Sequence, residues 1–136
     1  MKLTILSFLL VCVNAMFAQT TPTTKAVKPA LQFTTLEIVR ENIPYGSEEL
    51  FVFEFKNTTK KPIVISNVQT SCGCTAAEKP EAPIGKGKKG VIKVHYDTKR
   101  VGAFTKTITV FSNAGEPVVL TIKGTVLSQS DSPTTN

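Results

Sequence analysis

Short runs in which apolar and polar side chains alternate constrain the fold of this chain more than any other feature. In one such run, Phe51, Phe53 and Phe55 share one side of the chain. A period of two is that of a β-strand with one buried face, and no segment shows the 3.6-residue period of an amphipathic helix. Six runs of this kind, and one shorter run, are predicted to be strands: residues 31–39, 50–56, 63–70, 91–97, 104–111 and 118–127, with the shorter one at 75–79.

Each predicted strand offers one apolar face, which a second sheet has to cover. Residues 57–62 contain Asn and Pro, and residues 113–117 contain Asn, Gly and Pro, which is typical of turns between strands. The sequence therefore predicts an all-β fold, a single immunoglobulin-like β-sandwich of about seven antiparallel strands. Besides the phenylalanines, the predicted buried faces contain Ile92, Val94, Tyr96, Val118, Leu120, Ile122 and Val126.

Residues 1–18 have the order of a secretory signal peptide: Lys2, an apolar run at 5–13, and small residues at Ala15 and Ala18. Cleavage is predicted after Ala18 or Ala15, so we expect export to the periplasm or the cell exterior. The apolar run is about half of the roughly 20 residues that span a bilayer, and no later run is long enough, so no membrane span is expected. Cys12 follows apolar residues as in a lipoprotein box, but the residue before it is not small, so a lipid anchor is not expected.

The rest of the chain is expected to form one domain. Residues 19–29 are predicted to be a flexible linker, 30–127 the sandwich and 128–136 a disordered tail, because both flanks lack the apolar side chains needed for packing. Of the 16 basic residues, all but Lys2 follow the signal peptide, and with 10 acidic residues they give a net charge of +5. An exported protein without an arginine-rich cluster is not expected to bind nucleic acid, so this charge is interpreted as solvated surface.

Four segments carry a resemblance to a known family. They are F-x-F-x-N-T-T-x-x-P-I-x-I at 53–65, T-S-C-G-C-T at 70–75, P-I-x-x-G at 83–87, and G-x-F-x-K-x-I-T-V-x-S-N at 102–113. With these motifs the chain resembles a secreted bacterial family known as domain of unknown function number 1573. The resemblance implies an immunoglobulin-like domain similar to those of the major-sperm-protein and hydin type. It implies no activity, so function has to be argued from the residues.

Cys72 and Cys74 are the two cysteines outside the predicted signal peptide, and Gly73 separates them. Three interpretations are open. The pair can brace a loop, as a disulfide or as two small buried groups. It can exchange with other thiols, because a disulfide across one residue is tight and easily reduced. Its thiolates can also bind a soft ion such as Cu(I) or Zn(II), but a closed zinc site needs four ligands and only His95 is available beyond the pair. Gly73 and Thr75 are candidates for loop support.

No catalytic residue is predicted. His95 and Asp97 share one face of the predicted strand 91–97, and a cysteine would complete a nucleophilic set with them. That face is opposite to the apolar one, so His95 is expected to point to solvent. Residues 85–90 match G-x-G-x-x-G, but a strand follows them instead of the helix that a dinucleotide site requires. We therefore expect neither an enzyme nor a bound cofactor, unless the cysteines hold a soft ion.

The sequence favours an exported, non-enzymatic immunoglobulin-like module that binds another protein or an envelope component through its loops or a free strand edge. The alternative function is thiol redox exchange or soft-metal binding at Cys72-Gly73-Cys74. Asn57-Thr58-Thr59 also matches an N-glycosylation acceptor, which matters only in a host that glycosylates secreted proteins and is otherwise a turn.

Overall fold

The computed structural model describes residues 29–131, and every regular element in that part of the chain is a β-strand. The predicted signal peptide, with most of the predicted linker and tail, lies outside the described residues. The all-β prediction is confirmed, with slightly more strands than expected. In chain order the strands are β1 (Leu31–Phe33), β2 (Glu37–Ile43), β3 (Glu49–Asn57), β4 (Ile65–Thr70), β5 (Thr75–Glu78), β6 (Lys89–Tyr96), β7 (Gly102–Ser112) and β8 (Val118–Val126).

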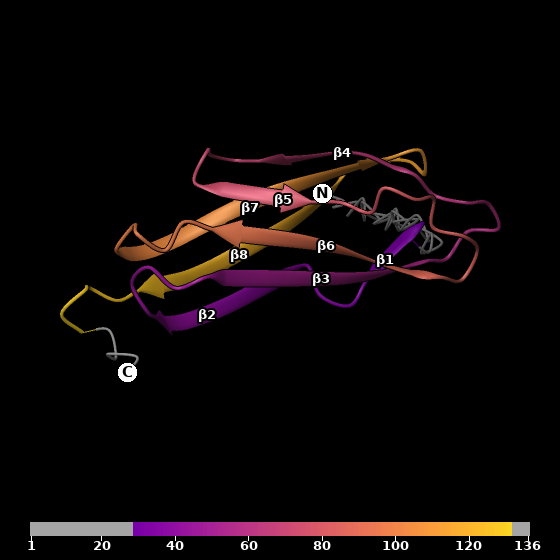
Figure 1. Cartoon of the computed structure of the whole chain (residues 1–136). Coiled ribbons are helices and arrows are strands. Elements are labelled where there is room, and N and C mark those ends of the chain that lie inside the picture. Colours follow the sequence, from indigo (N-terminus) through magenta and orange to yellow (C-terminus); the bar gives the residue numbers. More distant parts are fainter. Residues whose placement is uncertain (1–28, 132–136) are drawn as a thin grey trace, which may run out of the picture.

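The strands form two four-stranded sheets, which Figure 1 shows as the two layers of a sandwich. One sheet has the strand order β1-β3-β6-β5, and the other has the order β2-β8-β7-β4. Consecutive strands often belong to different sheets, so the chain crosses repeatedly from one layer to the other. The crossing from β4 to β5 connects an edge strand of one sheet to an edge strand of the other, and it contains both cysteines.

The core lies between the two sheets and is made by the alternating apolar residues. Phe51, Phe53 and Phe55 of β3 are at most 1% exposed, so the buried face predicted for this strand is confirmed. The faces predicted for β6 and β8 are confirmed in the same way, with Val118 partly buried. Burial of each large aliphatic or aromatic side chain contributes about 1.5–3 kcal/mol. Other core residues are Leu31, Ile43, Ile63, Ile65, Phe104, Ile108 and Val110.

The single strand predicted at 31–39 is wrong, because the chain changes sheet at Thr35. The Thr35 hydroxyl donates to the Glu37 carbonyl at 2.7 Å and accepts from the Glu37 amide at 3.2 Å. Such local side-chain bonds satisfy the backbone in a turn and interrupt a strand ladder. The first part therefore becomes β1 beside β3, and the second part becomes β2 beside β8.

One pair of strands departs from the expected antiparallel arrangement, since β2 runs parallel to β8. The other neighbouring strands pair in antiparallel fashion. β2 follows a change of sheet, so no hairpin turn determines its direction relative to its neighbour. Its register shifts between Arg40 and Ile43, where Asn42 has a φ of 57°. An irregularity of this kind at an edge strand discourages further strand pairing.

Asn57 organises the turn after β3. Its side chain is fully buried, its Nδ2 donates to the carbonyls of Lys61 and Ile84 at 2.8 Å, and its Oδ1 accepts from Thr59. The turn predicted at 57–62 is confirmed. Both N–H groups of the Asn57 side chain donate in these bonds. The N-glycosylation sequence at residues 57–59 therefore offers no free side-chain nitrogen for a glycan in the folded protein. The glycine-rich segment 85–90 is a loop leading into β6, and no helix follows it.

Candidate functional site

The cysteine turn lies between β4 and β5 and is held at both ends by backbone hydrogen bonds. The Ser71 amide donates to the Thr107 carbonyl at 3.0 Å, and the Ser71 hydroxyl accepts from the Thr107 amide at 3.1 Å. At the other end, the Asp97 amide donates to the Cys74 carbonyl at 3.0 Å. The turn is therefore anchored to β7 in one sheet and to the end of β6 in the other.

Cys72 and Cys74 form a disulfide with a Cα–Cα distance of 5.3 Å. Both cysteines are half-buried, and Gly73 between them is exposed. In this oxidised state the sulfurs are not available as thiolate ligands. An added Cβ at Gly73 would meet no atom within 4 Å, so this glycine is not needed for packing.

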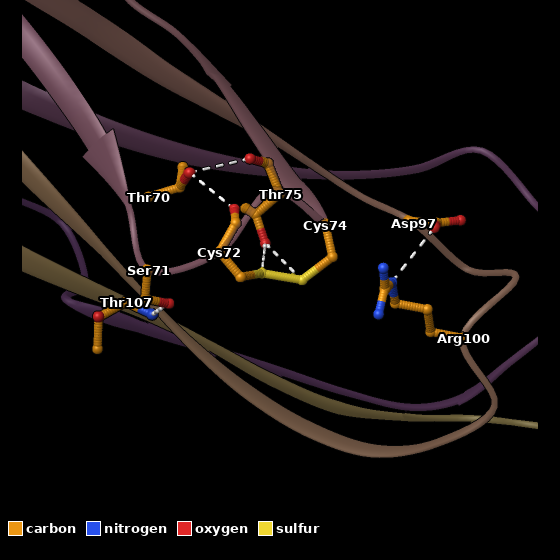
Figure 2. The surroundings of a disulfide bond; sticks show 8 residues. All are labelled: Thr70, Ser71, Cys72, Cys74, Thr75, Asp97, Arg100 and Thr107. Carbon is orange, nitrogen blue, oxygen red and sulfur yellow. Dashed lines mark hydrogen bonds and ion pairs between the residues drawn. A yellow bond between two sulfur atoms is a disulfide. The ribbon is translucent and has the colours of Figure 1, made fainter.

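Two threonines surround the disulfide, and Figure 2 shows that they act on different parts of the turn. The Thr70 hydroxyl donates to the carbonyls of Cys72 and Thr75, at 3.1 and 3.0 Å. The Thr75 hydroxyl instead lies 3.6 Å from the Cys72 sulfur and 3.8 Å from the Cys74 sulfur. Thr70 thus holds the backbone of the turn, as loop support requires, whereas Thr75 contacts the reactive atoms.

His95 and Asp97 are not brought into one site with the disulfide. The His95 side chain is 47% exposed on the outer face of β6, and its Nε2 lies 3.4 Å from Glu78 Oε1. The expected solvent-facing position of His95 is therefore confirmed. Asp97 instead pairs with Arg100, with 3.4 Å between Nε and Oδ2 (Figure 2). Each residue has its own charged partner, so the geometry assembles no Cys-His-Asp set.

Within residues 29–131, no three His, Cys, Asp or Glu side chains are grouped so that they could hold a metal ion. The described part also contains no helix of the length and apolar character that crossing a bilayer requires.

Tyr96 lies across from Thr75 in the β5–β6 pair and stacks on Phe104, with 3.8 Å between ring centroids. Burial raises the pKa of the Tyr96 phenol above its ordinary value of 10.0, Arg100 acts in the opposite direction, and Asp97 adds to the increase. The phenol beside the turn is consequently neutral at physiological pH and brings no charge to the disulfide.

A second candidate site is a groove at the edge of the sheet β1-β3-β6-β5, where β5 ends before β6 does. β5 pairs with β6 only from Lys93 to Tyr96, so β6 has no strand neighbour on that side from Lys89 to Ile92. If the register were continued, Pro80 would face Val91, and proline has no amide to donate to a ladder. The groove has a volume of about 360 Å³ and is lined by Glu78, Lys79, Pro80, Ile84, Lys89, Gly90, Val91 and Lys93.

The backbone of Val91 points into this groove. In an antiparallel pair, successive residues direct their amide and carbonyl alternately toward the partner strand and away from it. The Asn57 amide donates to the Lys88 carbonyl, and the register then directs the backbone groups of Gly90 and Ile92 toward β3 as well. The amide and carbonyl of Val91, which lies between those two residues, therefore face the groove. The groove could not be predicted from the sequence, because it depends on the β5–β6 register. The proline directly after the predicted strand 75–79 was the available signal.

Comparisons with known proteins agree with the β-sandwich fold. A family model described as "Protein of unknown function (DUF1573)" matches residues 31–126. No curated protein matches the chain significantly. The ASH/PapD-like domain 7 of human CEP192 has a TM-score of 0.63 at 8% identity, covering 79% of this chain and 92% of that one. A Porphyromonas gingivalis W83 protein of unknown function has a TM-score of 0.61 at 13% identity, covering 76% of this chain and 51% of that one.

A third similar structure is the Vibrio cholerae VesB protease, with a TM-score of 0.56 at 10% identity over 71% of this chain and 32% of that one. The chain spans about half the length of the P. gingivalis protein. At such low identities the likeness concerns the fold alone, which is immunoglobulin-like and PapD-like.

Proposed function

Because this chain belongs to the DUF1573 family of proteins of unknown function, we propose its role from its own geometry. It is an exported, non-enzymatic module that binds an extended segment of a partner protein. The observation that carries the proposal is the groove beside β6, in which a strand edge is left without a neighbour next to an exposed apolar side chain. Val91 is 37% exposed there.

An extended segment can add to such an edge through main-chain hydrogen bonds, while the groove selects its side chains. The Val91 amide and carbonyl supply one donor and one acceptor at the centre of the groove. Pro80 and Ile84 provide apolar surface beside them. A segment of a few residues therefore fits the position that β5 leaves empty.

The charge of the groove favours an acidic segment. Its lining contains Lys79, Lys89 and Lys93 but only one carboxylate, that of Glu78. The lysines form ion pairs with glutamates at 3.6–3.8 Å, and such exposed pairs contribute little to stability. A carboxylate of the partner can replace them at low cost, so the chemistry suits an acidic, extended peptide.

Site-specific photocrosslinking in the native host tests this function. A benzophenone amino acid at Val91 should give one discrete adduct, whereas the same group at Val119, which is 52% exposed on the other sheet, should not. Val91→Pro should abolish the adduct made from a neighbouring position such as Lys93, because it removes the amide that faces the groove and leaves the bonds to β3 in place. Equal labelling from Val91 and Val119 would contradict the proposal.

Export is the part of this function that depends on the predicted signal peptide. The intact mass of the protein, isolated from its native compartment without reductant and with thiols blocked, should correspond to a chain that begins after Ala18 or Ala15. A mass that includes residues 1–18 would contradict export. The same spectrum gives the state of Cys72 and Cys74.

A second function, thiol exchange at Cys72 and Cys74, is favoured by the position of their disulfide. The bond closes a ring of only three residues, and a short ring removes little entropy from the unfolded chain. A brace of this kind contributes little stability. Both cysteines are only half-buried, and the residue between them is exposed, so the pair lies at the surface, where an incoming thiol can approach.

Trapping of mixed disulfides tests the second function. In Cys72→Ser or Cys74→Ser, the remaining thiol can capture a partner but cannot release it by closing the native ring. At least one single variant should carry a reducible adduct in the native compartment, and the double variant should carry none. If both single variants have only free thiols, or only self-dimers, the pair does not exchange with other proteins.

A further inference from the structure

Thr75 is a buried hydroxyl residue whose hydrogen-bond partners are sulfur atoms. The residue is 5% exposed, and its Oγ1 faces both sulfurs of the disulfide (Figure 2). Among residues 29–131, these two sulfurs are the only partners of the Thr75 hydroxyl. A buried hydroxyl commonly has an oxygen acceptor, so this environment is unusual.

The two oxidation states of the cysteines differ in how well they accept this hydrogen bond. A neutral disulfide sulfur is a weak acceptor, whereas a thiolate carries a full charge and accepts a charge-assisted bond. The oxygen-to-sulfur distances of 3.6 and 3.8 Å allow the hydroxyl to reach either atom. We propose that Thr75 is a positioning residue of a redox site, donating its hydroxyl to the cysteine thiolate and so favouring reduction of the pair by thiols.

This inference rests on the thiol-exchange function and deepens it. In the first step, the thiolate of a reducing thiol attacks one cysteine sulfur and forms a mixed disulfide. The Cys72–Cys74 bond breaks, and its electron pair goes to the other sulfur, which leaves as a thiolate and accepts the Thr75 hydroxyl hydrogen. A second reducing thiol attacks the mixed disulfide. Two thiols are thereby oxidised to one disulfide, and the protein pair takes up two electrons and the two protons.

Thr70 provides a matched control on the other side of the turn. Its hydroxyl donates to the carbonyls of Cys72 and Thr75 and contacts neither sulfur. Loss of the Thr70 hydroxyl leaves two carbonyls without this donor and should loosen the turn. Loss of the Thr75 hydroxyl removes only bonds to weak acceptors in the oxidised protein. The two threonines therefore separate support of the turn from an effect on the thiolate.

The experiment equilibrates the full mature protein with reduced and oxidised glutathione at pH 6, 7.5 and 9, and counts blocked thiols by mass. In Thr75→Val the equilibrium should shift about tenfold toward the disulfide at pH 9, because a charge-assisted bond is lost. At pH 6 the shift should be much smaller, because few thiolates are present. Thr75→Ser should behave as wild type. Thr70→Val should be less stable but should show no shift that grows with pH.

Equal equilibrium constants for wild type and Thr75→Val at all three pH values would overturn the inference. So would the same pH-dependent shift in Thr70→Val, since the cause would then be the shape of the turn. If the valine variant does not fold, Thr75→Ala replaces it in the comparison with Thr75→Ser. Failure of the exchange function itself is a different result, in which no mixed disulfide is trapped in the native compartment while the Thr75 shift persists in glutathione.

Discussion

At the scale of single residues, Asn57 is the polar side chain on which the turn after β3 depends. Asn57→Asp keeps the shape but cannot donate to the carbonyls of Lys61 and Ile84, and it places a carboxylate in a fully buried position. We expect the free energy of unfolding at pH 7 to fall by about 3 kcal/mol or more. Urea unfolding measures the change. Asn113→Asp is the control, because exposed Asn113 uses only its Oδ1, as an acceptor from the Val64 amide.

The loss in Asn57→Asp should depend on pH. Burial raises the pKa of the introduced carboxyl above its value in the unfolded chain, so the folded state binds more protons. Stability is then highest below the unfolded pKa and falls as pH rises above it. The difference from wild type should therefore be smaller at pH 4 than at pH 7. A difference that does not vary with pH would show that no buried carboxyl titrates there.

Tyr96 should limit stability in alkali. Burial raises the pKa of its phenol, so the unfolded chain loses this proton first as pH passes the ordinary value of 10.0. Stability contributed by the neutral phenol is present below that pH and is lost above it. Tyr96→Phe retains the stacking on Phe104 and should raise the midpoint pH of alkaline unfolding, measured by circular dichroism. Its stability at pH 7 should remain within about 1 kcal/mol of wild type.

At the scale of elements, Gly124 determines how closely β2 can approach β8. A Cβ at Gly124 would overlap the Arg40 carbonyl oxygen and lie 2.9 Å from the Phe104 ring. Gly124→Ala should therefore displace β2 and lower the free energy of unfolding by about 2–3 kcal/mol, measured in urea. Gly73→Ala, where an added Cβ meets nothing within 4 Å, should change it by less than about 0.5 kcal/mol. Similar losses in both variants would contradict this account.

The elements also show what the sequence could predict. Alternation identified the inward faces of β3, β6 and β8, because a period of two reports burial directly. It did not identify the break at Thr35 or the parallel position of β2, since a hydroxyl turn and a partner more than eighty residues away leave no local periodicity. The cysteine turn was predicted as a candidate site because two cysteines one residue apart can form a disulfide, exchange with thiols or bind a soft ion. The contact of Thr75 with both sulfurs, and the groove beside Val91, depend on tertiary register and were not predicted.

At the scale of the whole molecule, the disulfide should be dispensable for folding. For a ring of three residues, the chain-entropy relation gives about 1.5 kcal/mol, which is small beside the burial of the aromatic and aliphatic core. Cys72→Ser with Cys74→Ser should therefore remain folded, with a similarly small loss in chemical denaturation. A loss above about 4 kcal/mol, or failure to fold, would identify the pair as a structural brace and remove the main argument for exchange.

The place of β8 within its sheet has a consequence for the time order of folding. β8 is the last strand of the chain, yet it lies between β2 and β7, so it connects the first half of the domain to the second. A ribosome delivers residues in order, so this sheet stays in two separate pieces until residue 126 has emerged. The growing chain thus cannot complete this sheet, or the core that it covers, before its last strand is available.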